Sequence, residues 1–320
     1  MKILFLSDFV PTGKISLDST FKGLINEADK VIFNLEGAPL NNTCFDEVNP
    51  IMPFDFGEFS AFLEQFNKDK FIIALANNHI LDNGESGFDY LIKKLTSSDI
   101  SFFGTKNKPF INIDGEVSVL NFVTAETVAR YSSRKKLNYL FYDPSTINKQ
   151  IKELEKKETD LILYPHWGRD MDRTIFDTYD LKLAEDKWHI FGHHPHVISG
   201  ISKNKIYSLG NTFIPHPNYY KRYPAMHYGL AVMYDSATQD YTSQITRVVS
   251  NDGFKKDFTL KAMIFDEMPL EVLKHGEDYS LLKKEYHKIL SFKGNHWDLY
   301  KLAFLQLMAK LFETKRKLRN

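Results

Sequence analysis

The chain has 320 residues, of which 43% are hydrophobic and 26% are charged, a balance typical of folded globular proteins and not of disordered ones. It carries 41 Lys and Arg against 41 Asp and Glu, so no overall charge attracts it to nucleic acid. A single cysteine, Cys44, excludes an internal disulfide and a cysteine-rich zinc site. No apolar run reaches the length of a signal-peptide core or a membrane span, so we expect a cytoplasmic protein.

Short apolar runs alternate with amphipathic stretches over the first two thirds of the chain. The apolar runs predict strands at residues 2–6, 31–35, 71–76, 101–103, 117–123, 161–164, 189–191 and 205–208. Apolar residues at helical spacing predict helices at 59–66, 88–95, 145–157 and 178–186. This alternation predicts an α/β fold in which helices cover a largely buried sheet.

The pattern changes after Asn211. Residues 228–235 and 241–249 predict an antiparallel pair of strands, and residues 269–320 predict mostly helix. We therefore expect a main domain over 1–265 and a helical extension over 266–320. The end of this extension is basic and amphipathic, which predicts either a solvated helix or peripheral contact with an anionic membrane.

Charged and metal-capable side chains follow several of these strands, at the point where each strand meets a loop. The residues are Asp8, Glu36, Asn78, His79, His166, His194 and His196. Because ligands of α/β sheets bind at the carboxyl ends of strands, we expect these side chains to converge on one crevice. Taken singly, Asp8 could equally cap a turn, and the segment around Asn78 could simply open the next helix.

Oxygen and imidazole ligands without a thiolate favour manganese, zinc or iron(II), and these residues offer enough donors for two divalent ions. Residues 192–196 read Gly-His-His-Pro-His, the strongest metal-binding signal in the chain. In an extended segment His194 and His196 point to one side and His193 to the other. We therefore predict His194 and His196 as ligands and His193 as a supporting residue.

These motifs, taken in order, resemble those of the CapA family of poly-γ-glutamate capsule synthesis proteins, a branch of the calcineurin-like metallophosphoesterases. The resemblance covers residues 1–215 and rests on Asp8, Asn34-Leu35-Glu36, Asn77-Asn78-His79-x-x-Asp82-x-Gly84, His166-Trp167-Gly168, Gly192-His193-His194-Pro195-His196 and Ser208-Leu209-Gly210-Asn211. It implies a four-layer α/β/β/α sandwich with two divalent metal ions at one end of two sheets.

The resemblance also implies a role for each site residue. The metal ligands would be Asp8, Glu36, Asn78, His166, His194 and His196. His79 would protonate the leaving group and Asp82 would orient it. One feature departs from the superfamily pattern: Phe9 and Val10 follow Asp8 where Asp-x-His is usual, so one imidazole ligand is missing at that corner.

The leading functional hypothesis is a metal-dependent hydrolase of phosphoester type in the synthesis of a capsule or another surface polymer, with Arg169 holding the developing negative charge. Its substrate would be a small molecule or polymer that carries phosphate or γ-glutamyl groups. Two alternatives remain open. The chain could hydrolyse γ-glutamyl amides with the same metals, or it could be a non-catalytic accessory protein of a capsular polymer synthase.

Overall fold

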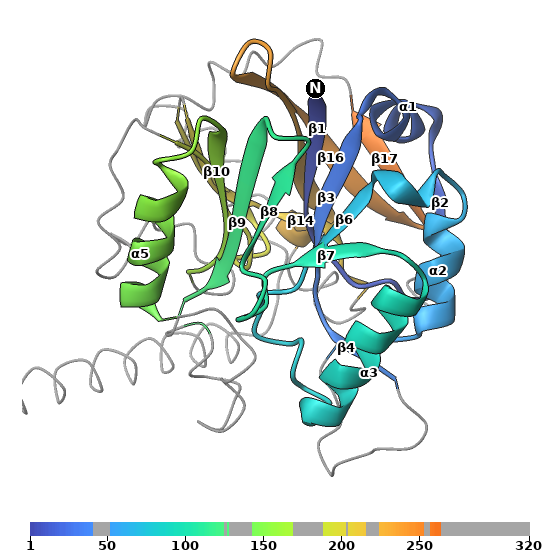
Figure 1. Ribbon diagram of the computed structural model, residues 1–320. Coiled ribbons are helices and arrows are strands. Elements are labelled where there is room, and N and C mark those ends of the chain that lie inside the picture. Colours follow the sequence, from blue (N-terminus) through green and yellow to red (C-terminus); the bar gives the residue numbers. More distant parts are fainter. Residues whose placement is uncertain are drawn as a thin grey trace, which may run out of the picture. The chain divides into compact units, whose positions relative to one another are not determined.

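The computed structural model describes residues 1–40, 52–124, 127, 143–168, 188–202, 204–215, 224–252 and 257–263. In this part of the chain two large sheets pack face to face and helices cover their outer faces (Figure 1). The predicted mixed α/β fold is thus confirmed. The boundary expected at 265/266 and the predicted helices at 178–186 and 269–320 lie outside the described residues.

The first sheet has nine strands in the described part, ordered β2-β17-β16-β15-β1-β3-β6-β7, with β14 paired to β1. Its strands are β1 (Lys2–Phe9), β2 (Lys14–Leu17), β3 (Lys30–Leu35), β6 (Phe71–Ala74), β7 (Ser101–Phe103), β14 (Asn211–Phe213), β15 (Tyr228–Asp235), β16 (Asp240–Ser250) and β17 (Asp257–Met263). Strands β1, β3, β6 and β7 run parallel, and β15, β16 and β17 continue the sheet antiparallel.

The second sheet has six strands in the described part, ordered β12-β13-β11-β10-β9-β8. Its strands are β8 (Phe110–Ile113), β9 (Val117–Val123), β10 (Asp160–His166), β11 (His189–Phe191), β12 (Ile198–Ser202) and β13 (Lys205–Leu209). The four central strands are parallel and the two edge strands are antiparallel to their neighbours. A separate parallel pair consists of β4 (Ala38–Pro39) and β5 (Pro53–Phe54).

The helices are α1 (Ser19–Glu27), α2 (Phe56–Leu63), α3 (Gly84–Ser97) and α5 (Pro144–Leu154), with short 3₁₀ turns η1 (Lys68–Lys70) and η3 (Pro224–His227). Side-chain carboxylates cap three of them: Asp18 begins α1, Asp55 begins α2 and Asp143 begins α5. The cap at Asp55 explains why α2 begins and ends three residues before the predicted 59–66. No helix among the described residues is both long and apolar enough to span a bilayer.

Within the part of the chain that the structure describes, three hydrophobic cores separate the layers. Strand β1 shows why its sequence is continuously apolar: Leu4 and Leu6 face the core under α1, α2 and α3, while Ile3 and Phe5 face the core between the two sheets. A third core lies between the second sheet and α5, whose Ile147 and Ile151 pack onto it. The layer order is therefore helices, first sheet, second sheet, helix.

All eight strands predicted in the first part of the chain are present, and β15 and β16 form the predicted antiparallel pair. The parallel strands of both sheets place their carboxyl ends at one edge. Asp8 lies near the end of β1, where it pairs with Asn34 of β3 on one side and with Asn211 of β14 on the other. On the second sheet His166 ends β10 and forms a parallel bridge with His193 beyond β11.

Candidate metal centre

Two groups of three metal-capable side chains lie at this edge, all of them buried. The first group contains Asp8, His166 and His193, and the second contains Glu36, His194 and His196. Within each group one ligand atom per residue lies within 4.8 Å of the others. Each group therefore combines one carboxylate from the first sheet with two imidazoles from the second.

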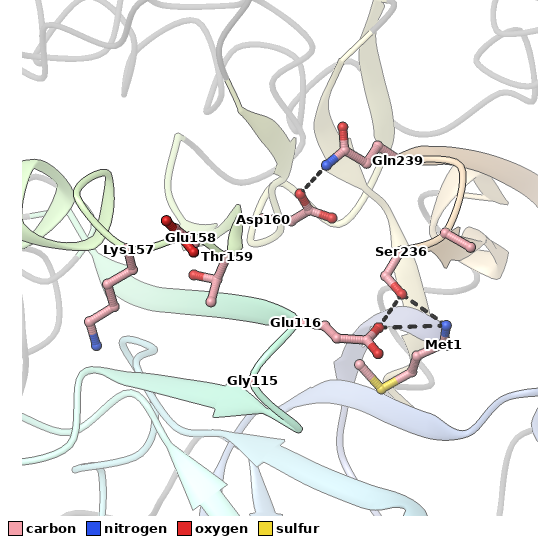
Figure 2. A pocket seen from close by; sticks show the side chains of 10 residues that line it. Met1, Gly115, Glu116, Lys157, Glu158, Thr159, Asp160, Ser236 and Gln239 are labelled. Atoms are coloured by element: carbon pink, nitrogen blue, oxygen red, sulfur yellow. Dashed lines mark hydrogen bonds and ion pairs between the residues drawn. The ribbon is translucent and has the colours of Figure 1, made fainter.

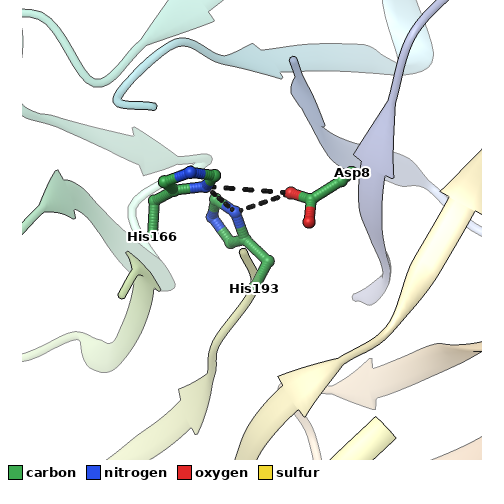
Figure 3. A group of neighbouring side chains, drawn as sticks. All are labelled: Asp8, His166 and His193. Carbon is green, nitrogen blue, oxygen red and sulfur yellow. Dashed lines mark hydrogen bonds and ion pairs between the residues drawn. The ribbon is translucent and has the colours of Figure 1, made fainter. Parts of the chain in front are cut away.

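In the first group both imidazole rings face the Asp8 carboxylate (Figure 3). Oδ1 of Asp8 lies 3.0 Å from Nδ1 of His193 and 3.8 Å from Nδ1 of His166, and the two ring nitrogens are 2.8 Å apart. These separations are suitable for three ligand atoms that together bind a single cation, each at a distance of about 2.0–2.2 Å.

The second group is linked to the first through two of the histidines. His196 has Nδ1 3.4 Å from Oδ2 of Asp8 and Nε2 3.9 Å from Oε1 of Glu36. His166 also reaches Glu36, with Nε2 3.9 Å from Oε1. Both carboxylates thus contact the same imidazoles, so the two groups form one continuous polar centre.

The electrostatics of this centre favour the metal-binding forms of Asp8 and His166. Burial alone would raise the pKa of Asp8, but hydrogen bonds with His193 and His196 hold it well below its usual range, so Asp8 is ionised. Burial, together with the neighbouring His194 and His193, lowers the pKa of His166 well below its usual range, so its ring is neutral. Metal binding requires an ionised carboxylate and a neutral imidazole.

The neighbours of the centre fit a metal ion as well. Nε2 of His166 lies 2.7 Å from the side-chain oxygen of Asn78 and donates to it, which leaves the Nδ1 lone pair directed at Asp8 and His193. Among the described residues, the buried Nε2 of His193 and Nδ2 of Asn78 have no hydrogen-bond partner. Carboxylate and imidazole donors without thiolates are suited to manganese, zinc or iron(II).

Comparison with known proteins shows the family of this chain. Residues 16–215 match the family described as bacterial capsule synthesis protein PGA_cap. This chain belongs to that family.

Among curated proteins, this PGA_cap member is 30% identical over 160 residues to the capsule biosynthesis protein CapA of Bacillus anthracis. The match covers 44% of this chain and 39% of that relative, so it spans well under half of the relative's length. A crystal structure with 14% identity aligns over 76% of this chain and 97% of its own, at a TM-score of 0.40, which is too low to support a conclusion.

The expected orientation of His193 in this PGA_cap member is wrong, whereas its role as a supporting residue and not a ligand stays a prediction. His193 does not point away from the centre, because the segment is not extended: φ is +102° at His194 and +60° at His196. These left-handed conformations turn His193, His194 and His196 toward the same centre. The expectation that His193 points to the opposite side failed because it assumed a regular extended strand. The sequence signal for its position was the presence of three histidines within four residues.

The structure brings five of the predicted metal ligands together in the two groups: Asp8, Glu36, His166, His194 and His196. The side chain of Asn78 contacts His166, so its role as a direct ligand remains a prediction. Arg169 lies outside the described residues. His79 and Asp82 are buried on the loop between β6 and α3, with Nδ1 of His79 2.8 Å from Oδ2 of Asp82.

A surface pocket lies elsewhere and contains none of these residues. It surrounds Glu116, Asp160, Ser236 and Gln239, close to Met1 (Figure 2). Met1 directly precedes β1 and Asp160 begins β10, so this pocket lies at the amino ends of strands whose carboxyl ends carry the candidate metal centre. Among its described residues there is no histidine, and it offers no comparable ligand set.

Proposed function

We propose that this PGA_cap family member is a metal-dependent hydrolase of phosphoester type that acts in the synthesis of a capsule or another surface polymer. The scaffold would be the four-layer metallophosphoesterase-like sandwich expected from the motifs. One observation carries the proposal: two linked carboxylate–imidazole groups lie buried at the edge where both sheets present the carboxyl ends of their strands.

The centre would hold two divalent cations. Asp8, His166 and His193 would bind the first, and Glu36, His194 and His196 would bind the second. Two such cations supply a water nucleophile activated at neutral pH and Lewis acidity for a phosphoryl group.

His79 would serve as the proton donor. Its Nδ1 contacts the Asp82 carboxylate at 2.8 Å, which fixes the orientation of the ring. The opposite ring nitrogen would then pass a proton to the leaving oxygen. The imidazole–carboxylate pair is itself buried, so its geometry is set by the fold and not by solvent.

The test measures metal content and turnover together. The full chain is loaded with Mn(II), Zn(II) or Fe(II) and assayed with bis(p-nitrophenyl) phosphate and p-nitrophenyl phosphate. We expect metal-dependent hydrolysis, lost in His194→Ala and kept in the matched variant His189→Ala, whose ring lies outside the centre. Absence of turnover with every metal would contradict the proposal.

A second candidate uses the same centre on a different bond. The family description names capsule synthesis, and the motifs resemble those of poly-γ-glutamate synthesis proteins, which favours hydrolysis of a γ-glutamyl amide. Release of glutamate from poly-γ-glutamate, without turnover of either phosphoester, would support this candidate instead. Metal binding without either activity would support the accessory role beside a polymer synthase.

The cellular setting is likewise a proposal. We place the protein in the cytoplasm, with a substrate that carries phosphate or γ-glutamyl groups and with peripheral membrane contact through the basic C-terminus. Co-sedimentation of the full chain with anionic phosphatidylserine vesicles tests the contact, because an electrostatic interaction weakens as salt is raised.

A further inference from the structure

Two buried asparagines connect the metal-centre carboxylate to the loop that carries His79. Nδ2 of Asn34 donates to Oδ1 of Asp8 at 2.8 Å. Nδ2 of Asn77 donates to Oδ1 of Asn34 at 3.0 Å. Oδ1 of Asn77 in turn accepts the backbone N–H groups of His79 and Ile80, at 3.0 and 2.8 Å. Asn34 and Asn77 are both fully buried.

The backbone fixes the direction of this chain of hydrogen bonds. A backbone N–H group can only donate, so the oxygen of the Asn77 amide must face His79 and Ile80. Its NH₂ group then faces Asn34, and it also donates to the carbonyl of Leu35 at 2.9 Å. Asn34 must accept through its oxygen and present its own NH₂ group to Asp8.

Asp8 is therefore held as an acceptor on both oxygens. Oδ1 accepts from Asn34, and Oδ2 accepts the backbone N–H of His194 at 3.0 Å. Successive amides aligned in one direction polarise one another, and a buried network that is fully satisfied stays in one arrangement. A shift of the His79 loop would break this alignment and move the Asp8 carboxylate.

We propose that Asn34 and Asn77 are positioning residues that lock the Asp8 carboxylate and the His79 loop into one geometry. The catalytic consequence of this lock rests on the proposed function, whereas its effect on metal binding does not. The side chain of Asn77 hydrogen-bonds to Asn34, Leu35, His79 and Ile80 and to no predicted ligand. An effect of Asn77 on metal affinity therefore has to pass through Asn34 or through the loop that also carries Asn78.

The test is a double-mutant cycle with Mn(II) affinity as the measured quantity. Asn34→Ala and Asn77→Ala are each expected to weaken Mn(II) binding by about 10-fold or more, in the range seen when groups that orient metal ligands are removed. If the two act as one relay, the double variant is no more than about twofold weaker than Asn34→Ala alone, since interacting sites are not additive.

Ser118→Ala is the matched control. Ser118 is fully buried and its hydroxyl contacts Thr159, but it lies near the amino end of β9. It should leave Mn(II) affinity unchanged and combine additively with Asn34→Ala. The visible absorption of bound Co(II) should shift in Asn77→Ala and not in Ser118→Ala, which separates ligand positioning from a general loss of stability.

Wild-type affinity in Asn77→Ala, or additive effects of the two asparagine variants, would overturn the relay. If Asn77→Ala does not fold, Asn77→Asp replaces it, because an ionised carboxylate accepts both N–H groups but cannot donate to Asn34; wild-type affinity there also overturns the relay. Metal binding that depends on both asparagines, in a chain that hydrolyses nothing, refutes only the proposed function. A wild-type chain that binds none of Mn(II), Zn(II) and Fe(II) refutes both.

Discussion

Nδ1 of His166 lies 2.8 Å from Nδ1 of His193, and neither ring is exposed to solvent. Without a cation, one of these nitrogens must carry a proton for the pair to be favourable. A cation bound between the rings would accept the lone pairs of both Nδ1 atoms. A variant of His193 therefore tests whether the first group binds a cation.

His193→Ala should weaken binding of the first divalent ion by at least about tenfold, because it removes one of three donors of that group. Calorimetric titration of the metal-free protein with Mn(II) measures this loss of affinity. His189→Ala is the control, since His189 lies on the adjacent strand β11 and contacts Tyr234 instead. Unchanged Mn(II) affinity in His193→Ala would show that His193 is a supporting residue and not a ligand, as the sequence analysis predicted.

Asp82→Asn should lower kcat without changing metal affinity, because Asp82 contacts His79 and belongs to neither metal group. General acid catalysis by a positioned side chain contributes about 10²–10⁴-fold, and loss of the orienting carboxylate removes part of it. The decrease should be larger for an alkyl phosphodiester than for a p-nitrophenyl ester, whose leaving group needs no proton. Equal decreases for both substrates would show that the pair does not protonate the leaving oxygen.

Gly192→Ala should impair folding and metal binding together. A Cβ at Gly192 would lie 2.1 Å from the backbone oxygen of Tyr207 and 2.4 Å from Nε1 of Trp167, so the segment that begins at His193 has to move. Gly23→Ala is the control, because the same methyl group on helix α1 meets no atom within 4 Å. It should be neutral or stabilise by up to about 1 kcal/mol. Thermal melts with and without Mn(II) report both effects.

His189 should make stability dependent on pH. Burial lowers its pKa, with the Gln239 carbonyl opposing this shift. The unfolded chain, with a His pKa of about 6.5, then binds more protons than the folded one, so this contribution is present above pH ~6.5 and is lost as the pH falls through the folded value.

Urea unfolding between pH 7.5 and 5 checks the sign. His189→Gln should lose less stability than the wild type as the pH falls. The difference should stay below about 1.4 kcal/mol per pH unit, because one ring changes the number of bound protons by at most one. Partial exposure of the ring to solvent makes the difference smaller still. Parallel curves for the two proteins would contradict the assignment.

Strands were predictable from the sequence where both faces are buried, as in β1, β3 and β9, because such strands are continuously apolar. Edge strand β8 was missed since its residues are largely half-exposed or exposed. Helix α1 was missed although its signal was present: Asp18 caps it, and Phe21, Leu24 and Ile25 form its buried face.

The sequence identified most residues of the candidate site, but not how all of them are oriented. Residues that end parallel strands, such as Asp8 and His166, were identified because the fold class places such ends together. The orientation of the His193 ring was not predictable, because it depends on left-handed backbone at His194 and His196 that no side-chain pattern reveals. The roles of Asn34 and Asn77 depend on strand register, which a single sequence does not specify.

Asp8 and His193 lie 185 positions apart along the chain, one on each sheet. During synthesis, a nascent polypeptide that has left the ribosome only as far as β10 contains Asp8, Glu36 and His166 but none of the histidines of residues 193–196. Neither ligand group can be completed at that stage. At translation rates of about 5–20 residues per second, the interval before those histidines emerge lasts for seconds. A cation bound by Asp8 and His193 would then link segments that belong to the two different sheets.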